Sequence, residues 1–109
     1  MLLQWKIGKV TITRILEIEL KVAYYEKYPF MRKARPEALA AIPWLSPNFV
    51  TEDGELIISI HALLVQTPKL NLLVDTCVGN DKSRAITGNE ALHTDFLKDL
   101  EAAGCPREK

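Results

Sequence analysis

This sequence is poor in the features that mark specialised protein classes. It has only two cysteines, Cys77 and Cys105, and no Cys-x-x-Cys pair, so it does not carry a disulfide framework. No apolar run approaches the roughly 18 residues that a membrane-spanning helix needs. We therefore expect a protein of the reduced cytoplasm that has no membrane partner.

A surplus of positive charge is also missing. Lys and Arg together number 14, as do Asp and Glu, so the formal net charge is zero. Non-specific binding to nucleic acid depends on a basic surplus, and we expect no nucleic-acid partner. Residues 24–35 mix tyrosines with Lys and Arg as single-strand-binding surfaces do, but Glu26 and the neutral total argue against that function. A neutral chain is also weakly protected against self-association.

The remaining composition is ordinary. Apolar residues make up 48% of the chain and charged residues 26%, as in a soluble globular domain. The length of 109 residues suits one small domain or part of a larger one. The first residues, Met-Leu-Leu-Gln-Trp-Lys, give too short an apolar stretch for a signal peptide, so we expect no secretory leader.

Residues 10–21, VTITRILEIELK, alternate between apolar and polar side chains as a half-buried strand does. The pattern predicts one face in the core and one in water, although Arg14 interrupts the first face and Ile15 the second. The predicted core face comprises Val10, Ile12, Leu16, Ile18 and Leu20. The predicted water face comprises Thr11, Thr13, Glu17, Glu19 and Lys21.

Residues 22–50 are irregular and rich in aromatic residues and proline. Pro36 is a favourable first helical residue and predicts a short helix over 36–41, which ends before Pro43. After an Asp-Gly turn signal at 53–54, the apolar runs 55–66 and 70–75 around the turn 67–69 predict a hairpin. Both of its strands are apolar on nearly both faces, so we expect them to be covered from both sides.

An amphipathic helix is predicted over 94–103, with Thr94 as its N-cap and Gly104 and Pro106 after its end. The apolar residues that recur at helical spacing are Leu92, Phe96, Leu97, Leu100 and Ala103. An apolar strand, a loop over 76–93 and this helix make the first two-thirds of a βαβ unit. We expect the parallel partner strand to lie beyond Lys109.

Asp75 stands where the apolar strand 70–75 ends. Parallel sheets place their functional loops beyond the carboxyl ends of their strands, and Gly79 in the loop that follows allows close backbone approach. Two roles are open for this carboxylate. It orients groups in a site that the following segment builds, or it makes an Asx-turn with the backbone of Cys77 or Val78.

The stretch VDTCVGNDKSR resembles the metallo-β-lactamase-fold hydrolases, in which the strand before the metal loop ends in an Asp. It looks most like a branch with Val-Asp-Thr-Cys-x-Gly-Asn-Asp-Lys-x-Arg, matched at 74–77, 79–82 and Arg84. Further blocks agree with the same branch, in order, over nearly the whole chain. They lie at 5–8, 12–15, 36–39, 44–45, Pro47, 59–63 and 100–104.

This resemblance implies an α/β fold: the N-terminal half of an αββα sandwich, with a mixed β-sheet and one main covering helix. Residues 1–109 would form a partial domain. The family carries His-x-His-x-Asp-His just after the strand that follows this helix, and the chain ends before it. A catalytic zinc needs about three protein ligands, and His61 and His93 lie far apart with no His–carboxylate cluster around them.

We therefore expect this chain alone to hold no metal ligand and no catalytic residue, and to be inactive. The resemblance implies one or two zinc ions in the full-length relative. There, a metal-activated water would attack a small-molecule ester, lactone, amide or phosphoester.

By the same resemblance, Asp75, Thr76 and Gly79 would support the metal loop without binding the metal. Hydrogen bonds of such supporting groups change metal affinity about 10–100-fold. The rim of the substrate pocket would comprise Tyr28, Phe30, Trp44 and Phe49, although a packed connecting loop is an equal interpretation of that region. We expect His61 to be a hydrogen-bonded histidine of a sheet face and His93 a loop residue.

Two other functions stay open. The unmatched βα unit leaves apolar strand edges exposed, which favours a non-catalytic interaction module, a homodimer or half of a split hydrolase. A thiol enzyme built around Cys77 is the third hypothesis. No Cys–His spacing supports it, and a small buried apolar role suits Cys77 better.

Overall fold

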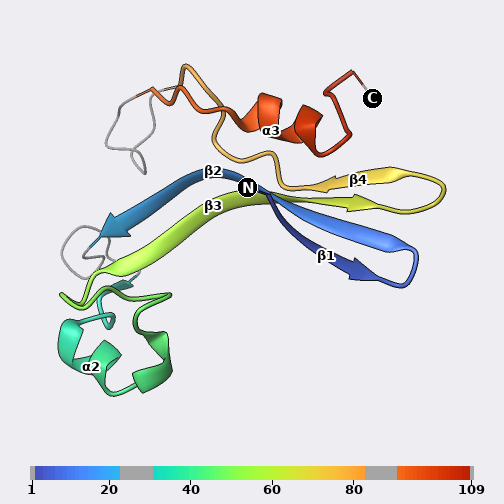
Figure 1. Cartoon of the computed structure of the whole chain (residues 1–109). Coiled ribbons are helices and arrows are strands. Elements are labelled where there is room, and N and C mark those ends of the chain that lie inside the picture. The colour runs from blue at the N-terminus through green and yellow to red at the C-terminus, as the bar shows by residue number, and fades with distance from the viewer. Residues whose placement is uncertain (1, 23–30, 83–90, 109) are drawn as a thin grey trace. The chain divides into compact units, whose positions relative to one another are not determined.

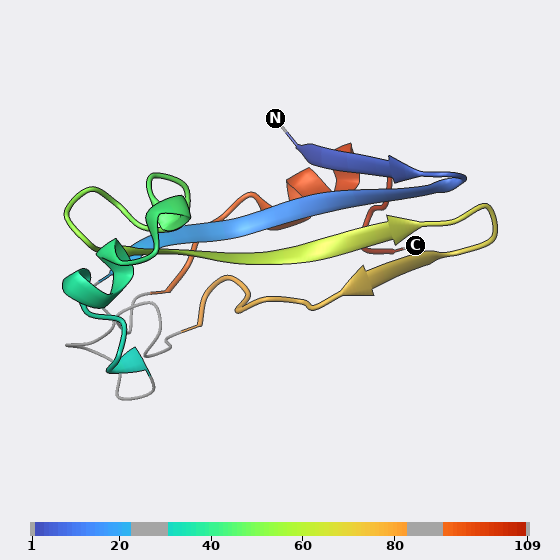
Figure 2. The same cartoon turned by 90° about the horizontal axis from the view of Figure 1, so that it is seen from below.

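The computed structural model describes residues 2–22, 31–82 and 91–108. They form strands β1 (Leu3–Ile7), β2 (Val10–Val22), β3 (Leu56–Gln66) and β4 (Asn71–Val74), helices α2 (Pro36–Ala40) and α3 (Phe96–Ala102), and the 3₁₀ helix η2 (Pro43–Leu45). The strands make one sheet in the order β1-β2-β3-β4 and lie side by side in Figure 2. None of the described helices is long and apolar enough to cross a membrane. Helices and strands are thus both present, as expected.

Tight turns connect the strands of each hairpin. Gly8 (φ 61°) and Lys9 join β1 to β2, and a positive φ at the first central residue suits a two-residue hairpin turn. Between β3 and β4, the Thr67 hydroxyl accepts the N–H groups of Lys69 and Leu70. Both hairpins are antiparallel, because such short connections cannot join parallel strands.

The strand directions differ from the mixed sheet that we expected. Figure 1 shows β2 and β3 running in opposite directions, so the sheet of the described residues is antiparallel. A parallel pairing occurs only as an isolated bridge, Asn80 with Leu92, among these residues.

The chain divides into two compact parts. The first contains Met1–Ile18 and Ile60–Lys109, and the second contains Glu19–Ser59. In the first part, Ile15, Ala62, Leu64 and Leu100 form the buried core. Leu100 belongs to α3, which covers this face of the sheet (Figure 1). α3 is therefore the covering helix that the sequence predicts.

In the second part, α2 begins at Pro36, as predicted, and a turn at 51–55 lies next to it. The Gly54 N–H donates to the Thr51 carbonyl, and the Thr51 hydroxyl accepts the Glu55 N–H. Gly54 has φ 85°, and a Cβ there would come within 2.9 Å of Pro36. Glycine is therefore required at this turn for its backbone angle and for space.

β2 is the main correction to the predicted strands. Its bounds agree with the prediction, but Thr13 (0% exposed), Ile15 (0%) and Glu17 (6%) are its buried residues. Thr13 and Glu17 were predicted to face water. Both are satisfied by partners outside their own strand, since Thr13 accepts a hydrogen bond from the Gln4 side chain at 2.8 Å. Glu17 is held by the distant loop that follows β4.

The face of the sheet opposite α3 is apolar as well. Residues opposite each other in adjacent strands share a face, so the strand registers group Trp5 with Ile12 and Val65 with Leu72. The apolar residues of this face in the first part are Leu3, Trp5, Ile7, Val10, Ile12, Leu16, Leu63, Val65, Leu72 and Val74. Leu3, Trp5, Ile7, Leu72 and Val74 are 45–66% exposed.

We expected both hairpin strands to be covered from both sides. The described residues of the first part cover only the α3 face, and every residue of β4 is exposed. The strands are apolar on both faces as predicted, but a second covering layer is not among these residues.

Candidate functional site around the 75–81 loop

The loop after β4 has an unusual backbone. Asp75 (φ 72°), Cys77 (φ 62°), Gly79 (φ 90°) and Asp81 (φ 61°) all have positive φ, and three of the four are not glycine. Side chains other than glycine rarely adopt this region, although Asp tolerates it better than most. Strained residues of this kind persist only where surrounding contacts hold them. The contacts come from three side chains: Asp75, Glu17 and Asn80.

Asp75 holds the beginning of the loop. Its Oδ1 atom accepts the Cys77 N–H at 2.7 Å, which is an Asx-turn. Of the two roles open for Asp75, the structure therefore shows the Asx-turn, with Cys77 as one of the two predicted partners. The role as a support for a metal stays a prediction.

Glu17 holds the middle of the loop from β2. Its two carboxylate oxygens accept the N–H groups of Val78 (2.9 Å) and Gly79 (2.8 Å). Consecutive backbone N–H groups that converge on one carboxylate resemble the anion-binding concavities of turn backbones. Hydrogen bonds to a charged acceptor contribute about 1.5–3 kcal/mol each, which offsets the cost of burying Glu17. Sequence reasoning missed this residue.

Asn80 holds the end of the loop against the segment before α3. Its Oδ1 accepts the Thr94 N–H at 2.9 Å, and its Nδ2 donates to the Thr94 carbonyl at 3.1 Å. The Asp81 N–H also donates to the Leu92 carbonyl at 3.0 Å. Thr94 therefore serves as a partner of Asn80, and the N-cap of α3 is Asp95, without a side-chain capping bond. The predicted Thr94 cap was wrong, because Asn80 binds its backbone and its hydroxyl.

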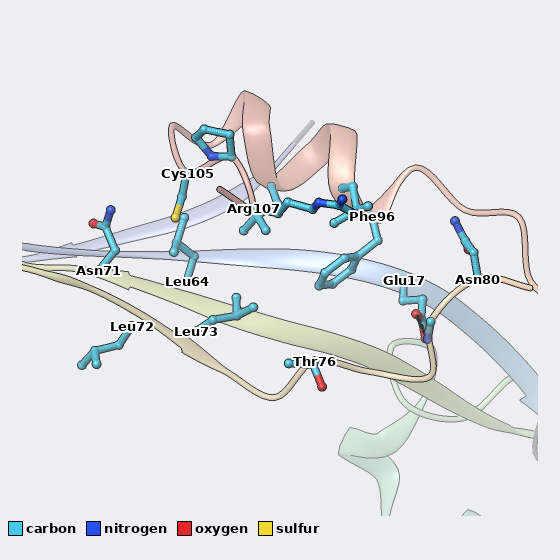
Figure 3. A pocket seen from close by; sticks show the side chains of 14 residues that line it. Glu17, Leu64, Asn71, Leu72, Leu73, Thr76, Asn80, Phe96, Cys105 and Arg107 are labelled. Carbon is cyan, nitrogen blue, oxygen red and sulfur yellow. Dashed lines mark hydrogen bonds between the residues drawn. The ribbon is translucent and has the colours of Figure 1, made fainter. Parts of the chain in front are cut away.

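A cavity of about 410 Å³ lies beside this loop, between α3 and the β4 side of the sheet. Figure 3 shows Phe96 from the α3 side and Leu73 from β4 pointing toward it, with Glu17 and Asn80 at one end. Its walls are mostly apolar. They comprise Glu17, Leu64, Asn71, Leu72, Leu73, Thr76, Gly79, Asn80, Phe96, Leu97, Leu100, Cys105, Pro106 and Arg107. Thr76 and Gly79, which the resemblance assigned to the support of a metal loop, thus line the same cavity as Glu17, which the sequence did not identify as a site residue.

Cys77 lies in the same loop and packs against the core. Burial raises the pKa of its thiol from 9.0 to about 11, and the negative charges of Glu17 and then Asp75 add to the effect. A nucleophilic cysteine requires a thiolate, so a raised pKa disfavours the thiol-enzyme hypothesis. Cys77 and Cys105 are both free thiols.

The two histidines lie where the sequence predicts them. His61 is a half-buried residue in the middle of β3. His93 is exposed in the segment before α3, with its Nδ1 3.3 Å from Asp81 Oδ1. Among the described residues, no three His, Cys, Asp or Glu side chains gather as a metal site needs.

The predicted pocket rim is described only in part. Tyr28 and Phe30 lie outside the described residues. Trp44 and Phe49 lie in the second part, with ring centroids 6.0 Å apart in an edge-to-face contact. They are 70% and 54% exposed. Neither is among the residues that line the hollow of about 270 Å³ found in that part.

Comparison with known proteins gives no relative for this chain. No family model matches it. No curated protein and no solved structure matches it either.

Proposed function

We propose that this chain, residues 1–109, is the N-terminal, non-catalytic part of a metal-dependent hydrolase with a metallo-β-lactamase-like fold. The observation that carries the proposal is the apolar second face of the sheet. α3 covers the face that contains Ile15 and Leu64, while Trp5, Leu72 and Val74 on the other face are exposed. A sheet with two apolar faces requires a layer on each side, and an αββα sandwich supplies a helix layer and a second sheet.

The energetics of this face favour a second layer. Burying a Val, Leu or Ile side chain completely contributes roughly 1.5–3 kcal/mol, and several such side chains are exposed here. Arg14 lies on the same face, and its Nε atom is buried with no hydrogen-bond partner among the described residues. A buried N–H without an acceptor costs free energy, so a covering layer with a carboxylate or carbonyl opposite the Arg14 Nε atom would stabilise the assembly.

The 75–81 loop supports the proposed position of the metal centre. Asp75, Thr76 and Gly79 follow the carboxyl end of β4, and Glu17 and Asn80 fix the backbone around them. A loop fixed in this way is suited to orient groups that bind a metal.

A zinc ion does not fit the described residues by themselves, because they offer no cluster of three ligands. The ligands of the one or two zinc ions in the proposal come from outside this chain. We assign no catalytic step to the chain itself. In the proposal, the complete enzyme hydrolyses a small-molecule ester, lactone, amide or phosphoester in the cytoplasm, and the two free thiols are in keeping with that compartment.

The reading frame that follows the codon for Lys109 tests this proposal. We expect it to encode an apolar strand and then His-x-His-x-Asp-His. A frame without a histidine cluster contradicts the proposal. So does stoichiometric zinc in the purified 109-residue chain together with hydrolysis that a chelator abolishes.

If the frame continues as expected, Asp75→Ala in the longer protein tests the role of the loop. We expect weaker zinc retention, by about tenfold, with a largely intact fold. Zinc retention equal to that of the unaltered protein would leave Asp75 with its Asx-turn alone.

A second candidate function is an interaction module or one half of a split hydrolase. The specific observation in its favour is β4, an edge strand whose four residues are all exposed. Such edges invite pairing with another chain.

A further inference from the structure

The cavity between α3 and the β4 side of the sheet has apolar walls and a negative charge at one end. Figure 3 shows Phe96 and Leu73 pointing toward it, with Glu17 at the end next to the loop. Leu64 and Leu100 also line it and are 1% and 5% exposed. All of its lining residues belong to the first compact part. The volume of about 410 Å³ lies in the usual range for small-molecule sites, about 300–1,000 Å³.

Glu17 brings a buried negative charge to this cavity. The residue is 6% exposed, and none of the ion pairs between described residues includes it. Its two oxygens each accept one backbone N–H, from Val78 and from Gly79. A carboxylate offers about four acceptor positions, so about two remain for other donors. Because a buried charge is stabilised by an opposite charge, these positions favour a cationic donor.

Arg107, the other charged residue of the lining, affects a bound molecule less. Its side chain is 70% exposed, and its Nε atom lies 3.5 Å from Glu108 Oε1. Water and the Glu108 carboxylate both weaken the field of the guanidinium group. Glu17 is buried, so its charge is screened less. The cavity therefore favours a positive group at the end that Glu17 occupies.

We propose that this cavity binds an amphiphilic primary amine, a small molecule with an apolar body and one ammonium group. The ammonium group donates to the free acceptor positions of the Glu17 carboxylate. The apolar body lies between α3 and β4, in contact with Leu73, Phe96 and Leu100. A carboxylic acid is disfavoured as a ligand, because it would place a second carboxylate beside Glu17.

This inference does not rest on the hydrolase proposal. The cavity lies beneath α3, on one face of the sheet. A parallel partner strand would instead pair with the backbone edge of β4, in the plane of the sheet. The amine therefore contacts side chains of the α3 face, whereas a partner strand contacts the backbone of β4.

NMR titration of the 109-residue chain with hexylamine, hexanol and hexanoate tests the inference, because these probes have similar apolar bodies and different head groups. We expect hexylamine to bind at least about tenfold more tightly than hexanol, since a charge-assisted hydrogen bond is stronger than a neutral one. Hexanoate should bind more weakly than hexanol, because its carboxylate is repelled by that of Glu17. The amide signals of Leu73, Phe96 and Gly79 should shift on binding.

Glu17→Gln should remove the preference for the amine, so that hexylamine and hexanol bind with similar affinity. This substitution also weakens the contacts of the loop, so circular dichroism must show that the variant is folded. If it is not folded, the comparison of the probes on the unaltered chain decides.

Two further variants keep Glu17 and change β4. Leu73→Trp fills the cavity from the sheet and should abolish the binding of hexylamine and hexanol alike. Val74→Trp enlarges the next side chain, which lies on the opposite face and outside the cavity, and should leave both affinities unchanged. Leu73 and Val74 are 37% and 54% exposed, so the fold should accept both substitutions.

Equal affinities of the unaltered chain for hexylamine and hexanol would overturn the inference, as would the absence of hexylamine binding. So would a preference for the amine that persists in a folded Glu17→Gln variant, or binding that Leu73→Trp leaves unchanged. Each of these results leaves the hydrolase proposal untouched, because the reading frame after the codon for Lys109 tests that proposal.

Discussion

Glu17 and Gly79 are 62 residues apart in the sequence, yet the Oε2 atom of Glu17 accepts the Gly79 N–H at 2.8 Å. Together with the bond from Val78, this contact joins β2 to the loop after β4. These two hydrogen bonds hold a strained stretch of backbone, in which residues 75, 77, 79 and 81 all have positive φ. The loop is therefore shaped by a residue that its own sequence does not contain.

Glu17→Gln should lower the free energy of unfolding by about 1–3 kcal/mol. The amide has one oxygen in place of two and directs its N–H₂ group at a backbone donor, so Val78 or Gly79 loses its acceptor. Urea unfolding followed by circular dichroism measures the change. Glu19→Gln is the matched control, because Glu19 lies on the same strand but is exposed. This substitution should change the free energy of unfolding by less than about 0.5 kcal/mol. Equal effects of the two variants would contradict the role of Glu17.

Asp75→Ala should destabilise the chain by about 1 kcal/mol, because it removes the acceptor of the Asx-turn and leaves alanine at φ 72°. Asp75→Asn keeps the Oδ1 acceptor and tolerates this backbone region, so its stability should stay near that of the unaltered chain. Thermal unfolding of both variants checks the difference. If Asn destabilises as much as Ala, the negative charge rather than the turn is what matters at this position.

Asn80→Ala should weaken the attachment of the loop to the segment before α3. Two hydrogen bonds to the Thr94 backbone are lost, at about 0.5–1.5 kcal/mol each. Amide hydrogen exchange should become faster at Thr94, whose N–H loses its acceptor. His93→Ala removes an exposed contact with Asp81 from the same segment and serves as the control, with an effect below about 0.5 kcal/mol. Unchanged exchange at Thr94 in the Asn80 variant would refute this assignment.

Alkylation of Cys77 by iodoacetamide should depend on pH with a midpoint near 11 in the folded chain, as the raised pKa of the thiol requires. In urea the midpoint should return to the ordinary value of about 9. Peptide mapping by mass spectrometry distinguishes Cys77 from Cys105, and Cys77→Ala gives the background. Rapid reaction of Cys77 at neutral pH would instead revive the thiol-enzyme hypothesis.

The same raised pKa determines the sign of a stability effect. Between pH 9 and about 11 the unfolded chain loses the Cys77 proton while the folded chain keeps it. The contribution of the protonated Cys77 thiol to the free energy of unfolding is therefore fully present below pH 9, and it is lost as the pH rises through this interval. Cys77→Ala should lose less stability than the unaltered chain over that interval, as measured by urea unfolding at each pH.

Features with local signals were predictable from the sequence. Pro36 correctly predicted the start of α2, and the turn at 67–69 correctly predicted the connection between β3 and β4. The Asx-turn of Asp75 was also within reach, because donor and acceptor lie two residues apart. β1 was not predicted, although Leu3, Trp5 and Ile7 alternate with polar residues and Gly8 follows them.

The buried face of β2 was not predictable in the same way. Alternation assigns Glu17 to water, and only partners 61 and 62 residues away make its burial favourable. Asn80 presents the same difficulty, since its partner Thr94 lies 14 residues further on. The candidate site therefore combines one residue found from its local pattern, Asp75, with two that only the folded chain reveals.

The first compact part is discontinuous, since it needs Met1–Ile18 together with Ile60–Lys109. During synthesis, the ribosome releases Glu17 well before Val78 and Gly79 leave the exit tunnel. Until then the Glu17 carboxylate stays hydrated. Nascent β2 also lacks its neighbour in the finished sheet, the hairpin of β3 and β4. Co-translational folding of this part therefore cannot be completed before the last third of the chain has emerged.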